Sequence, residues 1–144
     1  MFQGGGYLSI NYFYDRTRFR LKNEERLKYF IKKVITIKQR KTGNLSFIFT
    51  SDKSLLKINQ EFLGHDYFTD VISFDYGDND IINGEVYISI DRVKKNSRKF
   101  ETDLNIELTR VMLHGVLHLC GMNDIDPDER MQMRMEEEKF LKML

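Results

Sequence analysis

The chain has 144 residues, of which 41% are hydrophobic and 31% are charged, with a net charge of +1 and a single cysteine. This length suits one domain with a sizeable core, and one cysteine excludes an internal disulfide framework. No stretch approaches the ~20 apolar residues of a membrane span, and we expect no signal peptide, because the pattern of a basic and then an apolar region is not recognisable before the fold. We therefore expect a cytoplasmic protein with no membrane partner.

Alternating and β-branched patterns predict the strands of the fold. The first residues, Met1–Gly6, include three consecutive glycines, and we expect them to be disordered. Thr42-Gly43-Asn44 is typical of a turn. The predicted strands are Tyr7–Tyr14, Leu45–Thr50, Val71–Tyr76 and Glu85–Ile90. The polar segment Gly77–Gly84 joins the last two strands and predicts a hairpin.

Helical periodicity and capping residues predict five helices. They are a helix from Asn23 to about Lys38, Asp52–Phe62 capped by Ser51, a basic helix from its cap Asp91 to about Phe100, a long helix starting at Asp103, and Asp128–Leu144 with Pro127 in its first turn. In the second helix we expect Leu55, Leu56, Ile58 and Phe62 to face inward. In the last helix we expect Met131, Met135, Phe140 and Leu141 to pack in the core, and Glu136–Glu138 to form a solvated acidic patch.

Charge is distributed unevenly along this single α/β domain. Residues 1–100 carry 18 Lys/Arg and 12 Asp/Glu (18 − 12 = +6), and residues 101–144 carry 5 and 10 (5 − 10 = −5). Solvated helix faces explain most such runs, but a basic half also suits a phosphate-backbone partner. The four cations Lys94, Lys95, Arg98 and Lys99 are our candidates for that contact.

The most informative stretch is the apolar helix that carries two of the three histidines, His114 and His118. At i and i+4 they share one helical face. Gly121 then ends the helix, and Asp124 lies on the returning segment. We interpret His114, His118 and Asp124 as an open three-ligand site of the kind a catalytic zinc needs. Asp126 or Asp128 could replace Asp124 as the carboxylate ligand.

The same stretch also has a purely structural interpretation, and it limits the chemistry that the site can perform. The histidines could be satisfied core residues, but two adjacent buried imidazoles need a shared partner, and a metal supplies one. Gly115 occupies the position that holds the glutamate base of H-E-x-x-H metalloproteases, which argues against peptide hydrolysis. We interpret Cys120 as a small buried hydrophobe, because it points away from the ligand face.

Four stretches of the chain resemble the YbeY-type endoribonucleases, a family of bacterial rRNA maturation factors. They are Ile58-Asn59 leading to Gly64, Thr69–Phe74 (TDVISF), Gly84–Ser89 (GEVYIS) and His114–Gly121 (HGVLHLCG). The resemblance implies a mixed four-stranded sheet and a metal-dependent endoribonuclease for single-stranded RNA. It also implies a role in small-subunit rRNA maturation and ribosome quality control, with the small ribosomal subunit and assembly factors as partners.

This chain departs from the family pattern at three positions. The usual third ligand is a histidine where this chain has Asp124, so we expect Zn²⁺ with more tolerance of Mn²⁺ or Mg²⁺. The family tends to have arginine and proline where this chain has Leu63 and Phe68. His65, in the same loop, could contact a phosphate, donate a proton or replace a ligand, or be an ordinary loop residue.

Three residues are candidates for the catalytic group besides the metal ligands, namely Glu85, Ser73 and His65. The attacking oxygen could come from water or from the 2′-OH of the substrate. Two other functions fit the same residues: a metal-dependent hydrolase of another substrate, and a non-catalytic ribosome-assembly factor with a structural metal.

Overall fold

A computed structural model describes residues 9–144 of the chain. The expected disorder of Met1–Gly6 and the start of the first predicted strand at Tyr7 lie outside the described residues. Within residues 9–144, no helix has both the length and the apolar character needed to cross a bilayer.

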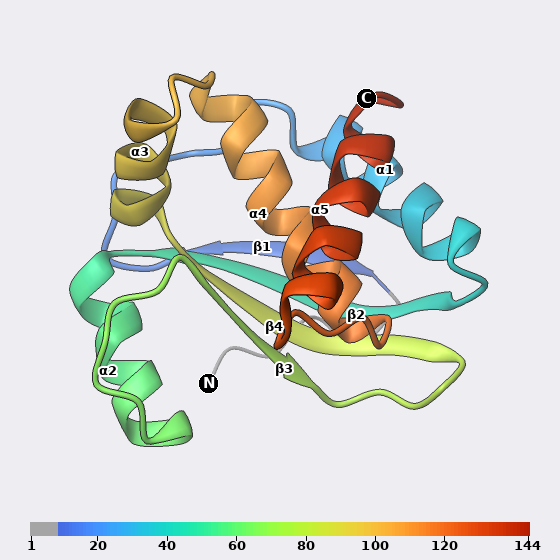
Figure 1. The fold of residues 1–144 in the computed structure, drawn as a ribbon, viewed down its shortest axis with the longest axis horizontal. Helices are drawn as coiled ribbons and strands as arrows, with labels where there is room; N and C mark the ends of the chain where they lie inside the picture. The colour runs from blue at the N-terminus through green and yellow to red at the C-terminus, as the bar shows by residue number, and fades with distance from the viewer. Residues whose placement is uncertain (1–8) are drawn as a thin grey trace.

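The centre of the fold is a mixed four-stranded sheet in the order β1-β2-β4-β3 (Figure 1). The strands are β1 Ile10–Tyr14, β2 Lys41–Thr50, β3 Val71–Asp75 and β4 Ile81–Ser89. Strands β1, β2 and β4 are parallel neighbours, and β3 pairs antiparallel with β4. The structure therefore confirms the predicted mixed sheet and the predicted hairpin.

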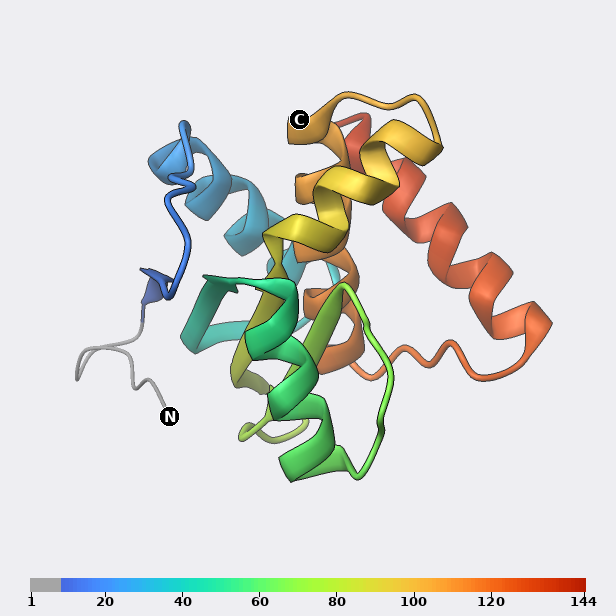
Figure 2. The same cartoon turned by 90° about the vertical axis from the view of Figure 1, so that its left-hand side faces the viewer.

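Five helices cover the two faces of this sheet in the described part of the chain. They are α1 Glu24–Ile37, α2 Asp52–Leu63, α3 Ile90–Lys99, α4 Leu104–Leu119 and α5 Pro127–Leu141. Only α2 lies below the sheet in the view of Figure 1, while α1, α3, α4 and α5 lie above it, and Figure 2 shows the same division. The α/β class and the helix count agree with the prediction.

The alternation of side chains along β4 explains how one strand serves both faces. Val86 and Ile88 belong to the large core shared with α1, α4 and α5. Tyr87, between them, belongs to the smaller core on the α2 side, with Ile48, Leu55 and Ile72. Residues of β4 with odd numbers therefore face α2, and this parity decides which polar side chains can reach α4.

Helix α4 is the central helix of the fold, since most of its residues are buried. Asp103 caps it, because its side chain accepts hydrogen bonds from the backbone N–H groups of Asn105 and Ile106. A Cβ atom added at Gly115 would lie only 2.6 Å from Cγ1 of Val86. The glycine thus permits close contact between α4 and the sheet, which leaves no space for a glutamate at this position.

Two local predictions about turns and caps are wrong. The predicted turn Thr42–Asn44 is part of β2, where a register shift between Thr42 and Leu45 accommodates the glycine. Helix α3 is capped by Ser89, whose Oγ accepts from the N–H of Arg92 at 3.1 Å, so Asp91 lies inside the first turn.

Some predicted core positions are also wrong. Phe62 is 53% exposed near the end of α2, and Met131 and Met135 are 64% and 65% exposed on α5. The prediction for Phe140 is confirmed, and the other buried residues of α5 are Met133 and Glu137. The buried face of α5 is thus rotated from the predicted one, which brings a glutamate of the expected acidic patch into the interior.

Candidate metal centre

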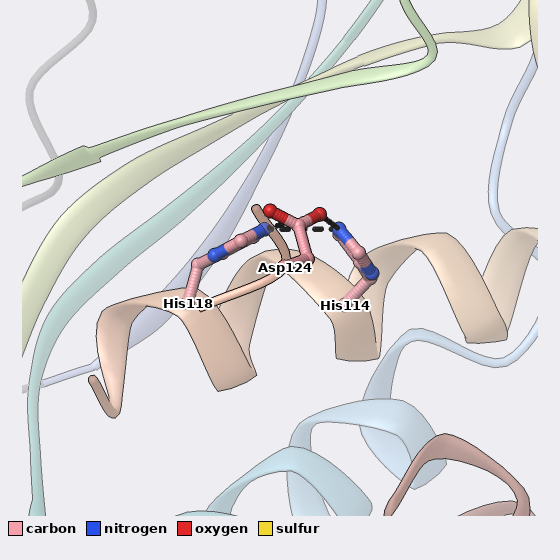
Figure 3. A group of neighbouring side chains, drawn as sticks. All are labelled: His114, His118 and Asp124. Carbon is pink, nitrogen blue, oxygen red and sulfur yellow. Dashed lines mark hydrogen bonds and ion pairs between the residues drawn. The ribbon is translucent and has the colours of Figure 1, made fainter. Parts of the chain in front are cut away.

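The two histidines lie one turn apart on α4, and their rings pack edge to face with centroids 4.6 Å apart. Beyond the helix, Gly121 adopts a left-handed conformation with φ of +94°. A non-glycine residue is disfavoured there, so the glycine reverses the chain as the sequence predicts. The reversal carries Asp124 back over the two imidazoles (Figure 3).

The three side chains present their polar atoms to one another. His114 Nε2 and His118 Nε2 are 3.0 Å apart, and each lies 3.2 Å from Oδ2 of Asp124. In a tetrahedral zinc site with bonds of about 2.0–2.1 Å, neighbouring ligand atoms are about 3.3 Å apart. The observed spacing therefore fits a small divalent cation bound by these three atoms.

The outer nitrogen of each imidazole contacts an acceptor. His118 Nδ1 lies 3.0 Å from the carbonyl oxygen of Met122, and His114 Nδ1 lies 2.6 Å from Oε2 of Glu137. Since a carbonyl or a carboxylate accepts, each Nδ1 carries the proton. In the neutral imidazoles both Nε2 atoms then present lone pairs toward the carboxylate, an arrangement that a cation stabilises.

Glu137 is the residue of this site that sequence reasoning missed. It is only 4% exposed, whereas the sequence placed it in a solvated acidic patch, so that prediction is wrong. Its other oxygen, Oε1, lies 3.9 Å from Nη1 of Arg110, and Arg110 also contacts Glu107 and Glu138. A buried carboxylate needs such partners, and here the partners are an arginine and a candidate metal-ligand histidine.

The electrostatic environment shifts the pKa of two groups at the site. Burial lowers the pKa of His114, but the hydrogen bond and charge of Glu137, together with the charges of Asp124 and Asp70, outweigh burial and raise it. Burial raises the pKa of Asp70, and the charge of His114 only partly opposes that effect. The surrounding carboxylates therefore favour the charged form of His114.

Two clefts meet at the candidate metal centre, and Asp70, His114 and Asp124 line both. The first, which we call the α5 cleft, has a volume of about 700 Å³. The second, the loop cleft, has a volume of about 440 Å³ and lies beside the segment that follows α2. The α5 cleft is lined by residues that include Phe100, Arg110, Arg130, Met131 and Arg134. The loop cleft is lined by residues that include Asn59, Leu63, His65, Tyr67 and Ser73. A long substrate can therefore contact the protein on both sides of the metal ligands.

The three candidate catalytic residues lie in different places. Ser73 lines the loop cleft, and its Oγ donates to the carbonyl oxygen of Gly115 at 3.2 Å. His65 lines the same cleft and is exposed. Glu85 is 5% exposed on the α2 face of the sheet, where its carboxylate accepts from the hydroxyls of Tyr76 and Tyr87. Glu85 therefore lines neither cleft, because its odd position on β4 directs it away from α4.

The candidate RNA-binding cations are exposed on α3 but line neither cleft. They are Lys94, Lys95, Arg98 and Lys99. The cations that line the α5 cleft are Arg110, Arg130 and Arg134, which the sequence did not indicate because they lie in the acidic half of the chain.

The alternative ligand Asp126 instead caps α5, where its side chain accepts from the N–H of Glu129 at 2.8 Å.

An α/β domain with an open His–His–carboxylate set between two clefts has the organisation of a metal-dependent hydrolase. The family model described as endoribonuclease YbeY matches residues 13–144. The chain belongs to this family, as its motifs indicated. A relative named endoribonuclease YbeY from Parabacteroides distasonis is 40% identical over 137 residues, which cover 95% of this chain and 96% of the relative.

Other similar proteins agree with this assignment. An endoribonuclease YbeY from Flavobacterium psychrophilum is 42% identical and covers 94% of this chain and 95% of its own length. The solution structure of a Thermotoga maritima protein superposes with a TM-score of 0.67 at 26% identity, and it covers 92% of this chain and 87% of its own. The fold described above is therefore that of a solved structure over nearly its whole length.

Proposed function

We propose that this protein is a metal-dependent endoribonuclease that cleaves single-stranded RNA at the centre formed by His114, His118 and Asp124. The observation that carries the proposal is the convergence of three ligand atoms within 4.8 Å of one another at the junction of two clefts. Family membership supplies the substrate class, and the open clefts leave room for a chain that passes across the ligands.

The donor set indicates which cation the site would hold. Two imidazole nitrogens and one carboxylate oxygen suit Zn²⁺, and the carboxylate also makes Mn²⁺ or Mg²⁺ acceptable. When bound, such a cation supplies Lewis acidity toward a phosphoryl oxygen and lowers the pKa of a water molecule or hydroxyl group. The tautomers of the histidines are already set for this role by Glu137 and by the carbonyl of Met122.

The protein's own groups divide the remaining tasks. Asp70 lines both clefts beside the ligands, and burial raises the pKa of its carboxyl, which favours the protonated form of this group. Ser73 links β3 to α4 through Gly115 and so maintains the width of the loop cleft. Arg130 and Arg134 are exposed in the α5 cleft and can neutralise phosphates of the bound strand.

The biological setting is a further part of the proposal. Membership of the endoribonuclease YbeY family supports a role in small-subunit rRNA maturation in the cytoplasm, with the small ribosomal subunit and assembly factors as partners. The substrate would be RNA in an unpaired region, because unstacked nucleotides can enter the clefts at the metal ligands.

The test is cleavage of a 5′-labelled single-stranded RNA by purified protein supplied separately with Zn²⁺, Mn²⁺ or Mg²⁺. We expect cleavage that stops on chelation and is lost in His118→Ala. A 2′,3′-cyclic phosphate on the product would indicate attack by the substrate 2′-OH, and a 5′-phosphate on the other fragment would indicate attack by water. No cleavage of RNA with any of the three metals would contradict the proposal.

A further inference from the structure

The segment that follows α2 carries two exposed aromatic rings beside the metal centre. The rings of His65 and Tyr67 are stacked, with centroids 5.1 Å apart and planes 18° from parallel. The hydroxyl of Tyr67 lies 2.9 Å from Nδ1 of His65. Both residues line the loop cleft together with the three metal ligands, and Tyr67 is 56% exposed. An exposed ring pair fixed in this way presents an aromatic face to whatever occupies the cleft.

The segment is held in place by a buried amide. Asn59 is 1% exposed, and its carbonyl oxygen accepts from the N–H of His65 at 3.1 Å. Its side-chain Nδ2 donates to the carbonyl oxygen of Tyr67 at 2.9 Å. One residue of α2 therefore fixes both members of the pair, so the aromatic surface is in position before any ligand binds.

The composition of the cleft wall indicates what lies against these rings. None of the described residues that line the loop cleft is lysine or arginine, and its acidic members are Asp70, Asp75 and Asp124. Away from the proposed metal ligands, a phosphate group is therefore disfavoured in this cleft, whereas a neutral planar group can stack on the rings. The α5 cleft, which has three arginines, is the side suited to the phosphate backbone.

We propose that His65 and Tyr67 form a stacking platform for one unpaired nucleobase of the RNA next to the scissile phosphate. This inference rests on the proposed endoribonuclease function and adds the direction of the substrate. The sugar-phosphate backbone follows the α5 cleft, and one base beyond the metal ligands is turned into the loop cleft. Stacking on aromatic side chains is sequence-tolerant, because every base has a π-face.

The test compares variants at Tyr67 with a control tyrosine. Metal-loaded protein is titrated into a fluorescein-labelled, single-stranded 2′-O-methyl oligonucleotide, and anisotropy gives the affinity. Tyr67→Ala should weaken binding by about 5- to 150-fold, the range that the loss of one stacked base produces. Tyr67→Phe keeps the ring and should bind nearly as wild type. Tyr29→Ala, at a tyrosine 70% exposed on α1 and outside both clefts, should have no effect.

A second set of oligonucleotides, each with one abasic position, identifies the stacked base. One position should weaken wild-type binding by the same factor as Tyr67→Ala and cause no further loss in that variant. If wild-type protein cleaves RNA and Tyr67→Ala binds and cleaves equally well, the platform is wrong and the endoribonuclease function stands. If wild-type protein neither binds nor cleaves RNA, both proposals are overturned.

Discussion

Oε2 of Glu137 lies 2.6 Å from Nδ1 of His114, which joins α5 directly to the metal-ligand helix. The carboxylate fixes the proton on Nδ1 and leaves Nε2 to face Asp124 and His118. It also increases the basicity of the imidazole, as carboxylate partners of metal-ligand histidines generally do. Glu137 is thus a positioning residue for His114, a proposed metal ligand.

Replacement of this carboxylate should weaken metal binding. We expect Glu137→Gln to lower Zn²⁺ affinity by about 10- to 100-fold, because the amide keeps the shape of the side chain but not its charge. Competition with a chromophoric chelator measures the affinity. Glu138→Gln is the matched control, since Glu138 contacts Arg110 but not His114. Equal affinities for both variants and wild type would contradict this role.

The close contact between Gly115 and Val86 predicts that replacing the glycine lowers stability, although helix propensity alone predicts a gain. Gly115→Ala should improve the intrinsic propensity of α4, yet it should reduce the free energy of unfolding by about 1–3 kcal/mol through overpacking. Urea unfolding gives the value. In the double variant Gly115→Ala/Val86→Ala, the removed methyl groups make space, so the combined loss should be smaller than the sum of the two single losses. Strict additivity would show that the two positions do not conflict.

The raised pKa of Asp70 predicts how stability varies with pH. In the metal-free protein, folded Asp70 binds its proton more tightly than in the unfolded chain, whose aspartates have a pKa of about 3.9. The native state therefore binds more protons over this window, and stability falls as pH rises from the unfolded pKa through the raised folded pKa. Asp70→Asn should remove this part of the decline. Urea titrations at a series of pH values check it, and an unchanged pH slope in the variant would argue against a buried, proton-holding Asp70.

The positions of the arginines predict which cations contact RNA. Arg134→Gln, in the α5 cleft, should weaken RNA binding and reduce the steepness of its salt dependence by about one phosphate contact. Arg98→Gln, on the exposed face of α3 outside both clefts, should have a smaller effect. Affinity measured from low to moderate salt compares the two variants. A larger effect of Arg98→Gln would restore α3 as the main contact surface.

The sequence predicts that the three candidate ligands lie together because the determinants of this arrangement are local. His114 and His118 share a helical face by their spacing, and Gly121 returns the chain at once toward Asp124. The strands of the sheet can also be predicted from the sequence, because they are short apolar runs bounded by polar segments. None of these inferences requires knowledge of how distant elements pack.

The rest of the site depends on tertiary packing. Glu137 reaches His114 only because α5 packs on α4. The buried stripe of α5 consists of Met133, Glu137 and Phe140, so its middle residue is charged. Glu85 lies within the stretch Gly84–Ser89 that resembles the family, but its place on β4 directs it to the opposite face of the sheet from Val86. Asp126 lies only two residues beyond Asp124, yet it caps α5 instead. A helical stripe at residues 133, 137 and 140 was the one available signal for Glu137.

The most direct test of the metal centre is the metal content of purified protein, measured by mass spectrometry for wild type and Asp124→Ala. We predict about one Zn²⁺ per wild-type chain and a sharp loss in the variant, because the carboxylate supplies one of only three protein ligands. The same metal content in both proteins would exclude Asp124 from the ligand set. No metal in wild type, even after reconstitution with Zn²⁺, Mn²⁺ or Mg²⁺, would contradict the proposal that His114, His118 and Asp124 bind a metal ion.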